Sequence, residues 1–299
     1  RFGVLVFQIL PFPLVLDDFT FVERAGFDNA WVADHFSWVP QQDLALLEGW
    51  TALAALAAGT ERIRVGTMIT NVATRNPAML AKQALTVDQI SGGRLDMGVG
   101  GGFFQREHEF LGIPFLDAKG RAQRLRESVE ILDKALRGGR VSFTGEHYHL
   151  DDAPIQPAPT QQPRPPLWVA AQGPTSLKTA ALFGDTVICM GEGDGLDACV
   201  ESFRARMARV DQICGEIGRD PASLRRCYFG GFADEPLFAS PEVTADFIAR
   251  LIEASATDFV LPLANSAVPA YENSLRAHSM ASRKQMERIA DDVLPAFRS

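Results

Sequence analysis

Eight short strand-like segments alternate with helix-like segments along the chain, and this alternation constrains the fold more than any other feature of the sequence. The expected strands cover residues 2–9, 30–33, 62–69, 94–99, 167–171, 185–190, 224–229 and 258–263. Repeated β-then-α units build parallel sheets, and eight of them can close into a TIM barrel of about 250 residues. An open doubly wound sheet would place a glycine-rich loop after its first strand, where this chain has Leu10-Pro11-Phe12-Pro13. We therefore predict an α/β fold with one (β/α)8 barrel domain over residues 1–299.

Two insertions into the barrel are expected, one after the fourth strand and one before the fifth. An irregular stretch leads into a charged amphipathic helix over residues 120–136, and residues 141–150 alternate like a hairpin. The proline-rich residues 154–166 form a connection that wraps back to the fifth strand, because the strand and helix alternation resumes directly after them.

Capping residues predict several helix boundaries. Asp17 and Asp18 can cap a first helix that runs to about residue 25, and Asn76-Pro77 resembles a cap followed by proline at the first helical position. The last helical region is expected to cover residues 266–296.

Charge and cysteine usage exclude several classes of function. The 29 basic and 37 acidic residues give a net charge of −8, which argues against binding to nucleic acid or to an anionic membrane surface. No apolar run reaches the roughly 18 residues of a membrane span, and no segment resembles a signal peptide. The four cysteines form no Cys-x-x-Cys pair, so we expect free thiols and a cytoplasmic location.

Polar and glycine-rich segments follow several of the predicted strands. Asp34-His35 ends the second strand, Gly100-Gly101-Gly102 ends the fourth, and Gln172-Gly173 ends the fifth at a helix start. In a (β/α)8 barrel these exits share the face where active sites lie. Glycine lets backbone approach a flat ring, and a helix N-terminus can bind a phosphate. The pattern predicts a slot for a flat aromatic cofactor that carries a phosphate.

Six motifs in the same order resemble those of the bacterial luciferase-like superfamily of (β/α)8 flavin and deazaflavin enzymes. They are WVADHF (31–36), NPA (76–78), GGRLDMGVG (92–100), FTGEHY (143–148), AAQGP (170–174) and GDTVIC (184–189). The last two are similar to the branch that uses coenzyme F420, which includes F420-dependent glucose-6-phosphate dehydrogenases. The Asp-His pair points the same way, because many FMN-dependent members have Glu-His at that position.

The resemblance implies a role for each matching residue. Asp34 would hydrogen-bond the polar edge of the deazaflavin, and His35 would lie near its reactive carbon and assist proton movement. Met68-Ile69 would form a non-prolyl cis peptide behind the ring. The remaining cofactor-binding positions would be Gly100, Gly101, Arg106, Ala170, Ala171, Gln172, Gly173 and Met190.

The chain departs from the sugar-phosphate dehydrogenases of this superfamily at two places. Phe103 stands where they carry a catalytic carboxylate, and Gly193, between Glu192 and Asp194, stands where they carry a phosphate-binding lysine. Glu107 and Glu109 are the acids of the insertion that could supply a carboxylate. The substrate side is expected to be aromatic, lined by Phe36, Trp38, Phe103 and Phe104.

We therefore expect an F420-dependent oxidoreductase that acts on a small neutral or hydrophobic molecule and not on glucose 6-phosphate. An FMN-dependent monooxygenase on the same barrel is the alternative, and a cofactor-binding protein without catalysis is a third possibility. No metal site is expected, because His147 and His149 lack an evident third ligand. A homodimer is left open.

Overall fold

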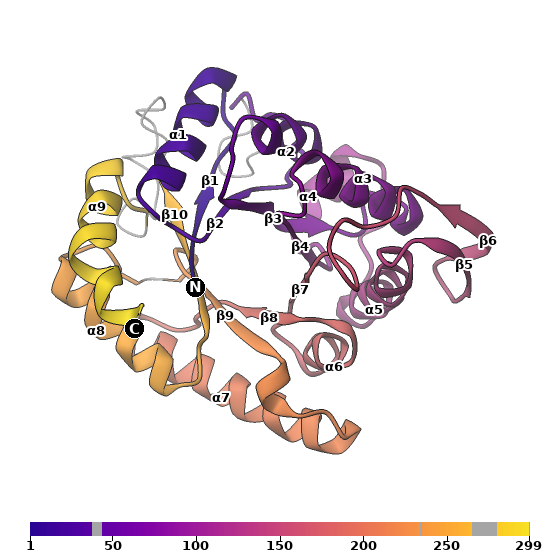
Figure 1. Cartoon of the computed structure of the whole chain (residues 1–299). Coiled ribbons are helices and arrows are strands. Elements are labelled where there is room, and N and C mark those ends of the chain that lie inside the picture. Colours follow the sequence, from indigo (N-terminus) through magenta and orange to yellow (C-terminus); the bar gives the residue numbers. More distant parts are fainter. Residues whose placement is uncertain (38–43, 234, 265–279, 299) are drawn as a thin grey trace.

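Eight parallel strands close into a barrel surrounded by helices (Figure 1), as the alternation predicts. The structure is a computed structural model that describes residues 1–37, 44–233, 235–264 and 280–298. Around the barrel the strands follow the order β1-β10-β9-β8-β7-β4-β3-β2. Their bounds are β1 (Phe2–Val6), β2 (Asn29–Val32), β3 (Arg64–Asn71), β4 (Leu95–Gly100), β7 (Leu167–Ala170), β8 (Thr186–Cys189), β9 (Arg225–Phe229) and β10 (Asp258–Leu263).

Each helix follows a barrel strand along the chain, and α3 begins where its capping residues predict. Their bounds are α1 (Phe12–Arg24), α2 (Gly49–Ala58), α3 (Pro77–Ile90), α5 (Ala118–Ala135), α6 (Pro174–Phe183), α7 (Gly195–Ile217), α8 (Pro241–Glu253) and α9 (Arg283–Arg288). The Asn76 side chain accepts a hydrogen bond from the Ala78 N–H at 2.9 Å, and Pro77 opens α3. This satisfies one of the free N–H groups of the first helical turn.

Both predicted insertions are present between β4 and β7. The short helix α4 (Gln105–Phe110) follows β4, and β5 (Gly139–Thr144) pairs antiparallel with β6 (His149–Ile155). This hairpin projects beyond the ring of helices on the right of Figure 1. The barrel strands therefore continue from β4 to β7 as neighbours in the sheet.

The first helix begins earlier than the sequence pattern predicts. Pro11 is the extended residue before α1, and Pro13 lies in its first turn, so the helix begins at Phe12. Asp18 lies inside α1, where it accepts a hydrogen bond from the Arg283 Nε at 2.7 Å instead of capping the helix. Burial raises the pKa of this carboxyl, and Arg283 opposes the shift.

The last helical region is also more broken than predicted. Residues 265–279 of the expected range lie outside the described residues. The α-helix α9 is followed by a π-helical turn over Ile289–Val293 and a 3-10 turn over Leu294–Phe297. Pro295 occupies this last turn, where its ring cannot continue α-helical hydrogen bonding.

Alternate residues of each strand face two separate cores. Leu5 and Phe7 point into the barrel, where the Trp31 and Trp168 rings meet edge-on with centroids 4.9 Å apart. Their neighbours, such as Val4, pack outward against the helices. The barrel is therefore filled by side chains, and a ligand site can form only at its ends.

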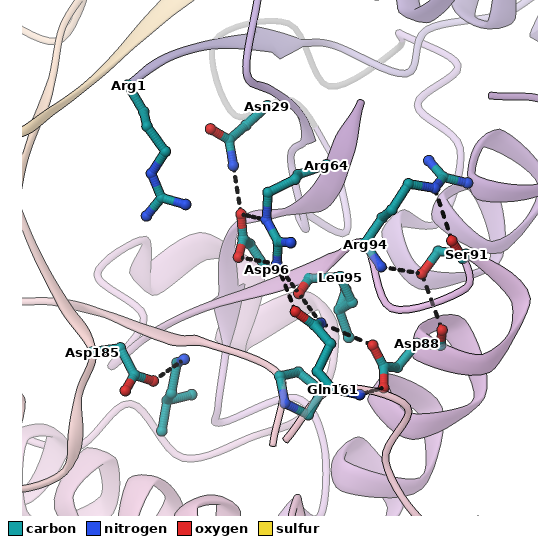
Figure 2. Close-up of polar contacts among 12 residues, drawn as sticks. Arg1, Asn29, Arg64, Asp88, Ser91, Arg94, Leu95, Asp96, Gln161 and Asp185 are labelled. Carbon is teal, nitrogen blue, oxygen red and sulfur yellow. Dashed lines mark hydrogen bonds and ion pairs between the residues drawn. The ribbon is translucent and has the colours of Figure 1, made fainter. Parts of the chain in front are cut away.

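A polar network joins the starts of β2, β3 and β4 at the end of the barrel opposite the strand exits (Figure 2). Arg64 donates from Nε and Nη2 to the buried Asp96 carboxylate at 2.8 and 2.7 Å, and Asn29 donates to the same carboxylate. Gln161 accepts from Arg64 at 2.9 Å and donates to Asp88 at 2.9 Å. The proline-rich connection is thereby tied to the strand starts.

Candidate active site

The predicted Asp34-His35 pair leaves the barrel at the end of β2 and is fixed by a side chain from the neighbouring strand exit. Gln8, which follows β1 and is fully buried, donates to the Ala33 carbonyl and to the Leu47 carbonyl. Its side-chain oxygen accepts from the Ala33 N–H at 3.2 Å. These bonds determine the direction in which the chain enters Asp34.

The Asp34 carboxylate is buried and paired with an arginine that the sequence analysis did not single out. Arg75 donates from both terminal nitrogens to Asp34, at 2.5 and 2.9 Å, and also contacts Glu48. Burial raises the pKa of Asp34, and the nearby Arg75 charge opposes that shift. Gly49 lies so close that a Cβ there would be 2.9 Å from Asp34 Oδ1, which explains the glycine.

His35 is held by Glu107, one of the two acids noted in the insertion. The Glu107 Oε1 lies 3.0 Å from His35 Nδ1 and accepts the Phe36 N–H at 2.8 Å. Glu107 is 3% exposed, and the edge of the Phe104 ring lies against the imidazole. Glu109, by contrast, is an exposed residue that pairs with Arg106. The helix α4 thus directs one acid to the histidine and the other to solvent.

A bulge at the end of β3 carries the predicted cis peptide. The bond between Met68 and Ile69 is cis, and the pairing of β3 with β4 shifts between Thr67 and Thr70. Met68 points into the barrel core, and Ile69 lies half-buried above it. Buried hydroxyls support the bulge, because Thr70 donates to Thr67 at 2.8 Å and Thr67 donates to the Gly98 carbonyl at 3.1 Å.

Three neighbouring strand exits form a continuous apolar row beside this bulge. A Cβ added to Gly100 would lie 3.2 Å from Ile69 Cγ2 and 3.4 Å from Ala170 Cβ. Ala170 and Met190 are half-buried and extend the row along β7 and β8. Gly100 is itself buried, and because it has no side chain the end of β4 lies close to Ile69 and Ala170.

The loop from β7 to α6 holds the remaining predicted residues, with different orientations. Ala171 points outward into the helix layer and not toward the row. The N–H groups of Gln172 and Gly173 donate to the Ser176 hydroxyl at 3.2 Å each. The Gln172 Oε1 is buried and accepts no hydrogen bond from the described residues. This loop therefore offers an acceptor at the start of α6, while Ser176 engages two of its donors.

Gly101 and Arg106 differ from each other in what they contact. Gly101 approaches α5, where a Cβ would lie 3.5 Å from the Arg121 carbonyl oxygen. Arg106 is exposed, pairs with Glu109 and covers the Phe110 ring, with 4.5 Å from its guanidinium carbon to the ring centroid. Arg106 is thus engaged with its own helix in this structure.

Aromatic side chains form a rim at the same face. Phe36 and Phe103 are each 59% exposed, and the Phe103 and Phe104 ring centroids are 4.1 Å apart. The Phe36 ring lies 6.3 Å from that of Phe110. Trp38, also expected here, lies outside the described residues. We call Phe36, Phe103, Phe104 and Phe110 the aromatic rim.

A buried arginine on α5 is a further candidate that sequence reasoning missed. Arg124 is 7% exposed, and its Nε and Nη2 find no hydrogen-bond partner among the described residues. Burial lowers its pKa, while Tyr148 opposes the shift. The Tyr148 hydroxyl contacts the Val72 carbonyl at 3.3 Å, directly after β3. A buried cation with unused donors is suited to an anionic group.

The exit of β8 contains a cation that its sequence does not reveal. Arg206, from α7, donates to the Met190 carbonyl at 2.8 Å and pairs with Glu192. The acidic pair Glu192 and Asp194 is therefore partly neutralised. Because Arg206 already pairs with the Glu192 carboxylate, it is less available to a substrate phosphate than the phosphate-binding lysine expected in sugar-phosphate dehydrogenases.

No group of three or more metal-ligating side chains occurs among residues 1–37, 44–233, 235–264 and 280–298, and His149 instead contacts Thr144. None of the helices described is long and apolar enough to span a bilayer.

Comparison with known proteins identifies a family whose model matches most of the chain. Residues 15–297 match the family model described as luciferase-like monooxygenase. An F420-dependent glucose-6-phosphate dehydrogenase of Amycolatopsis mediterranei (strain U-32) is 29% identical over 274 residues, covering 91% of this chain and 74% of the relative. The oxygenase component of a flavin-dependent trigonelline monooxygenase of Acinetobacter baylyi is 34% identical over 169 residues, 55% of this chain and 44% of that one. Several other curated relatives are likewise matched over about half of their length.

Solved structures share the barrel. An F420-dependent secondary alcohol dehydrogenase in complex with an F420-acetone adduct superposes with a TM-score of 0.81 at 19% identity, covering 100% of this chain and 99% of the other. At that identity the likeness establishes the fold.

Proposed function

The chain belongs to the luciferase-like monooxygenase family, and we propose that it is an F420-dependent oxidoreductase that transfers a hydride between the deazaflavin and a small organic substrate. The observation that carries the proposal is the apolar row of Ile69, Gly100 and Ala170 beside the cis-peptide bulge, with His35 at the neighbouring strand exit. The choice of F420 over FMN is supported by the Asp34-His35 pair and by the F420-dependent relatives.

The residues at this face suit a flat, phosphate-bearing cofactor. Because Gly100 has no side chain, the row leaves room that an alanine Cβ would fill. A bound deazaflavin would supply the carbon that accepts or donates a hydride. Ile69, Gly100, Ala170 and Met190 would hold its ring, and Asp34, oriented by Arg75, would accept a hydrogen bond from its polar edge.

The tail of the cofactor would lie toward the exits of β4 and β7. We assign Gly101, Arg106, Ala171, Gln172 and Gly173 to this region, with Ala171 contributing backbone only, because its side chain points outward. Arg124, which has unused donors, would attract the negative charge of the tail from behind these exits.

His35 would move the proton that accompanies hydride transfer. Histidine is the side chain that most often transfers protons in enzyme active sites. The ring is part-buried between Glu107 and Phe104, so its position is fixed before a substrate arrives. Fixed geometry of this kind contributes directly to rate.

The substrate is proposed to be neutral or hydrophobic. The aromatic rim offers apolar area for a flat or hydrocarbon-like molecule. Phe103 provides no carboxylate for a sugar substrate. At the exit of β8, Arg206 already pairs with Glu192, so this segment offers little attraction to a sugar phosphate.

Equilibrium fluorescence titration with F420 and with FMN tests the cofactor. We expect tighter binding of F420, and Asp34→Ala should weaken it by about 1–3 kcal/mol, the scale for leaving a buried partner unsatisfied. Glu48→Ala is the matched control, because it removes the other carboxylate that contacts Arg75. Equal or tighter binding of FMN would overturn the assignment.

An FMN-dependent monooxygenase is the second candidate, and it is favoured by the trigonelline monooxygenase relative. That enzyme class would need reduced FMN and oxygen. Product formation from the same substrate panel with reduced FMN, and none with F420, would support it. Binding of F420 without turnover of any compound would point to a non-catalytic cofactor-binding protein.

A further inference from the structure

Glu107 is a buried carboxylate, and one of its oxygens contacts both His35 and Phe36. Its Oε1 lies 3.0 Å from His35 Nδ1 and 2.8 Å from the Phe36 nitrogen. The side chain is 4% exposed, while that of His35 is 23% exposed. The Nδ1 edge of the imidazole is therefore held by Glu107.

The chemistry of these groups fixes the state of the imidazole. A carboxylate only accepts hydrogen bonds, so Nδ1 must carry the hydrogen in the contact with Glu107. In that tautomer the ring lone pair lies on Nε2. The Phe36 N–H also donates to Oε1, so the carboxylate cannot turn away without losing a second bond.

We propose that Glu107 is a positioning residue for the hydride transfer described above, acting through His35; this rests on the proposed function. When a carbinol is oxidised, its carbon would transfer a hydride, which carries two electrons, to the deazaflavin, while the hydroxyl would lose its proton to His35 Nε2. The substrate becomes a carbonyl, and the imidazole becomes a cation beside the Glu107 carboxylate. Water later removes the proton, and carbonyl reduction follows the same steps in reverse.

Other charged groups near His35 do not fill this role. Asp34 influences His35 electrostatically, but its carboxylate is paired with Arg75, which also contacts Glu48. On α4 itself, Arg106 and Glu109 pair with each other at the surface, and His108 contacts the Pro114 carbonyl. Glu107 is the carboxylate that reaches the imidazole directly.

Two substitutions of Glu107 distinguish its role as a hydrogen-bond acceptor from the role of its negative charge. In Glu107→Gln the amide oxygen should replace Oε1, because both partners are donors and would repel the amide NH2. This variant keeps the tautomer and removes the negative charge. Glu107→Ala removes both. Glu109→Gln is the control, since it removes an exposed carboxylate from the same helix.

The first readout needs no cofactor. Long-range 15N–1H NMR of the protein, with the His35 signal identified by its loss in His35→Gln, reports which ring nitrogen carries hydrogen. We expect the Nδ1–H form in the unchanged protein and in Glu107→Gln, and a mixture in Glu107→Ala. An unchanged tautomer in Glu107→Ala would overturn the proposal.

The second readout is steady-state turnover with F420. Removal of a group that orients a catalytic ligand or base typically costs about 10–100-fold. We expect Glu107→Gln to lower kcat within that range with KM changed less than about threefold, and Glu109→Gln to change neither. Unchanged kcat in Glu107→Gln would refute the charge role. If the unchanged protein turns over nothing with F420, the proposed function fails while the tautomer result still decides the effect of Glu107 on His35.

Discussion

The Arg75 guanidinium donates two hydrogen bonds to the Asp34 carboxylate, with N–O distances of 2.5 and 2.9 Å, although the two residues are 41 positions apart. The contact ties the exit of β2 to the loop before α3. It also means that the most conspicuous acid of the sequence is already paired before any ligand binds. Breaking a buried pair on one side leaves an uncompensated charge, which is costly.

Arg75→Met should therefore destabilise the protein by about 3 kcal/mol at neutral pH, as expected when one partner of a buried pair is removed. Burial already raises the pKa of Asp34, and losing Arg75 should raise it further. A raised folded-state pKa of an acid means that the folded state binds more protons than the unfolded one, so stability falls as pH rises through this window. The loss should shrink on acidification toward pH 4. Urea unfolding between pH 4 and 8 measures it, with Arg106→Met at an exposed pair as the control; a pH-independent loss would contradict the account.

Gly100→Ala should weaken F420 binding by at least about tenfold, or 1.4 kcal/mol, and should destabilise the protein by about 1–3 kcal/mol, because the added methyl overpacks a buried strand end. The new Cβ would meet Ile69 Cγ2 at 3.2 Å and Ala170 Cβ at 3.4 Å and would occupy the surface proposed for the ring. Gly215→Ala is the control, because nothing lies within 4 Å of its added Cβ, and alanine is favoured over glycine within a helix such as α7 by up to about 1 kcal/mol. If Gly100→Ala binds F420 with unchanged affinity, the row of Ile69, Gly100 and Ala170 does not contact the cofactor ring.

Arg124→Met should leave stability unchanged or raise it, because it replaces a buried cation, whose Nε and Nη2 have no partner among the described residues, by an apolar chain of similar length. The same change should weaken binding of F420 by about tenfold, which corresponds to one lost charged hydrogen bond. Arg124→Met should not change the affinity for a deazaflavin that lacks the phosphate tail. Thermal unfolding and parallel titrations with the two ligands measure both effects, and equal losses for both ligands would rule out a role for Arg124 with the tail.

Glucose 6-phosphate should not be oxidised. Phe103 offers no proton acceptor, and a phosphate dianion near Glu192 and Asp194 would compete with a carboxylate for Arg206. The assay follows deazaflavin absorbance with the sugar phosphate and with a panel of apolar alcohols, aldehydes and enones. A catalytic efficiency of about 10⁴ M⁻¹s⁻¹ or more for the sugar phosphate, within the ordinary enzyme range, would show that the substrate side was misjudged.

The barrel was predictable because its signal is repeated. Each strand is a short apolar run between capping residues, so errors of a few residues at one end, as at Asp18, did not change the topology. The cis peptide between Met68 and Ile69 followed from the family resemblance and is present. The cytoplasmic location and a homodimer stay predictions.

Contacts between distant segments were not predictable. Glu107 and Glu109 are two positions apart on one short helix, and only the orientation of α4 decides which acid is buried. Arg75 occurs in a loop with no periodic pattern. Arg124 belongs to a charged amphipathic helix, where it looks like the partly exposed Arg121 and Arg126 until the fold buries it.

The bonds around Gln161 have a practical consequence for engineering. They join the proline-rich connection to Arg64 and the Leu95 carbonyl at the strand starts and to Asp88 in the last turn of α3, and no residue of the aromatic rim takes part in them. Rim positions such as Phe36 and Phe103 can therefore be randomised in a directed-evolution library while strand order and register are specified from the other end. Altered substrate preference in such a library would then report on the rim itself and not on a loosened scaffold.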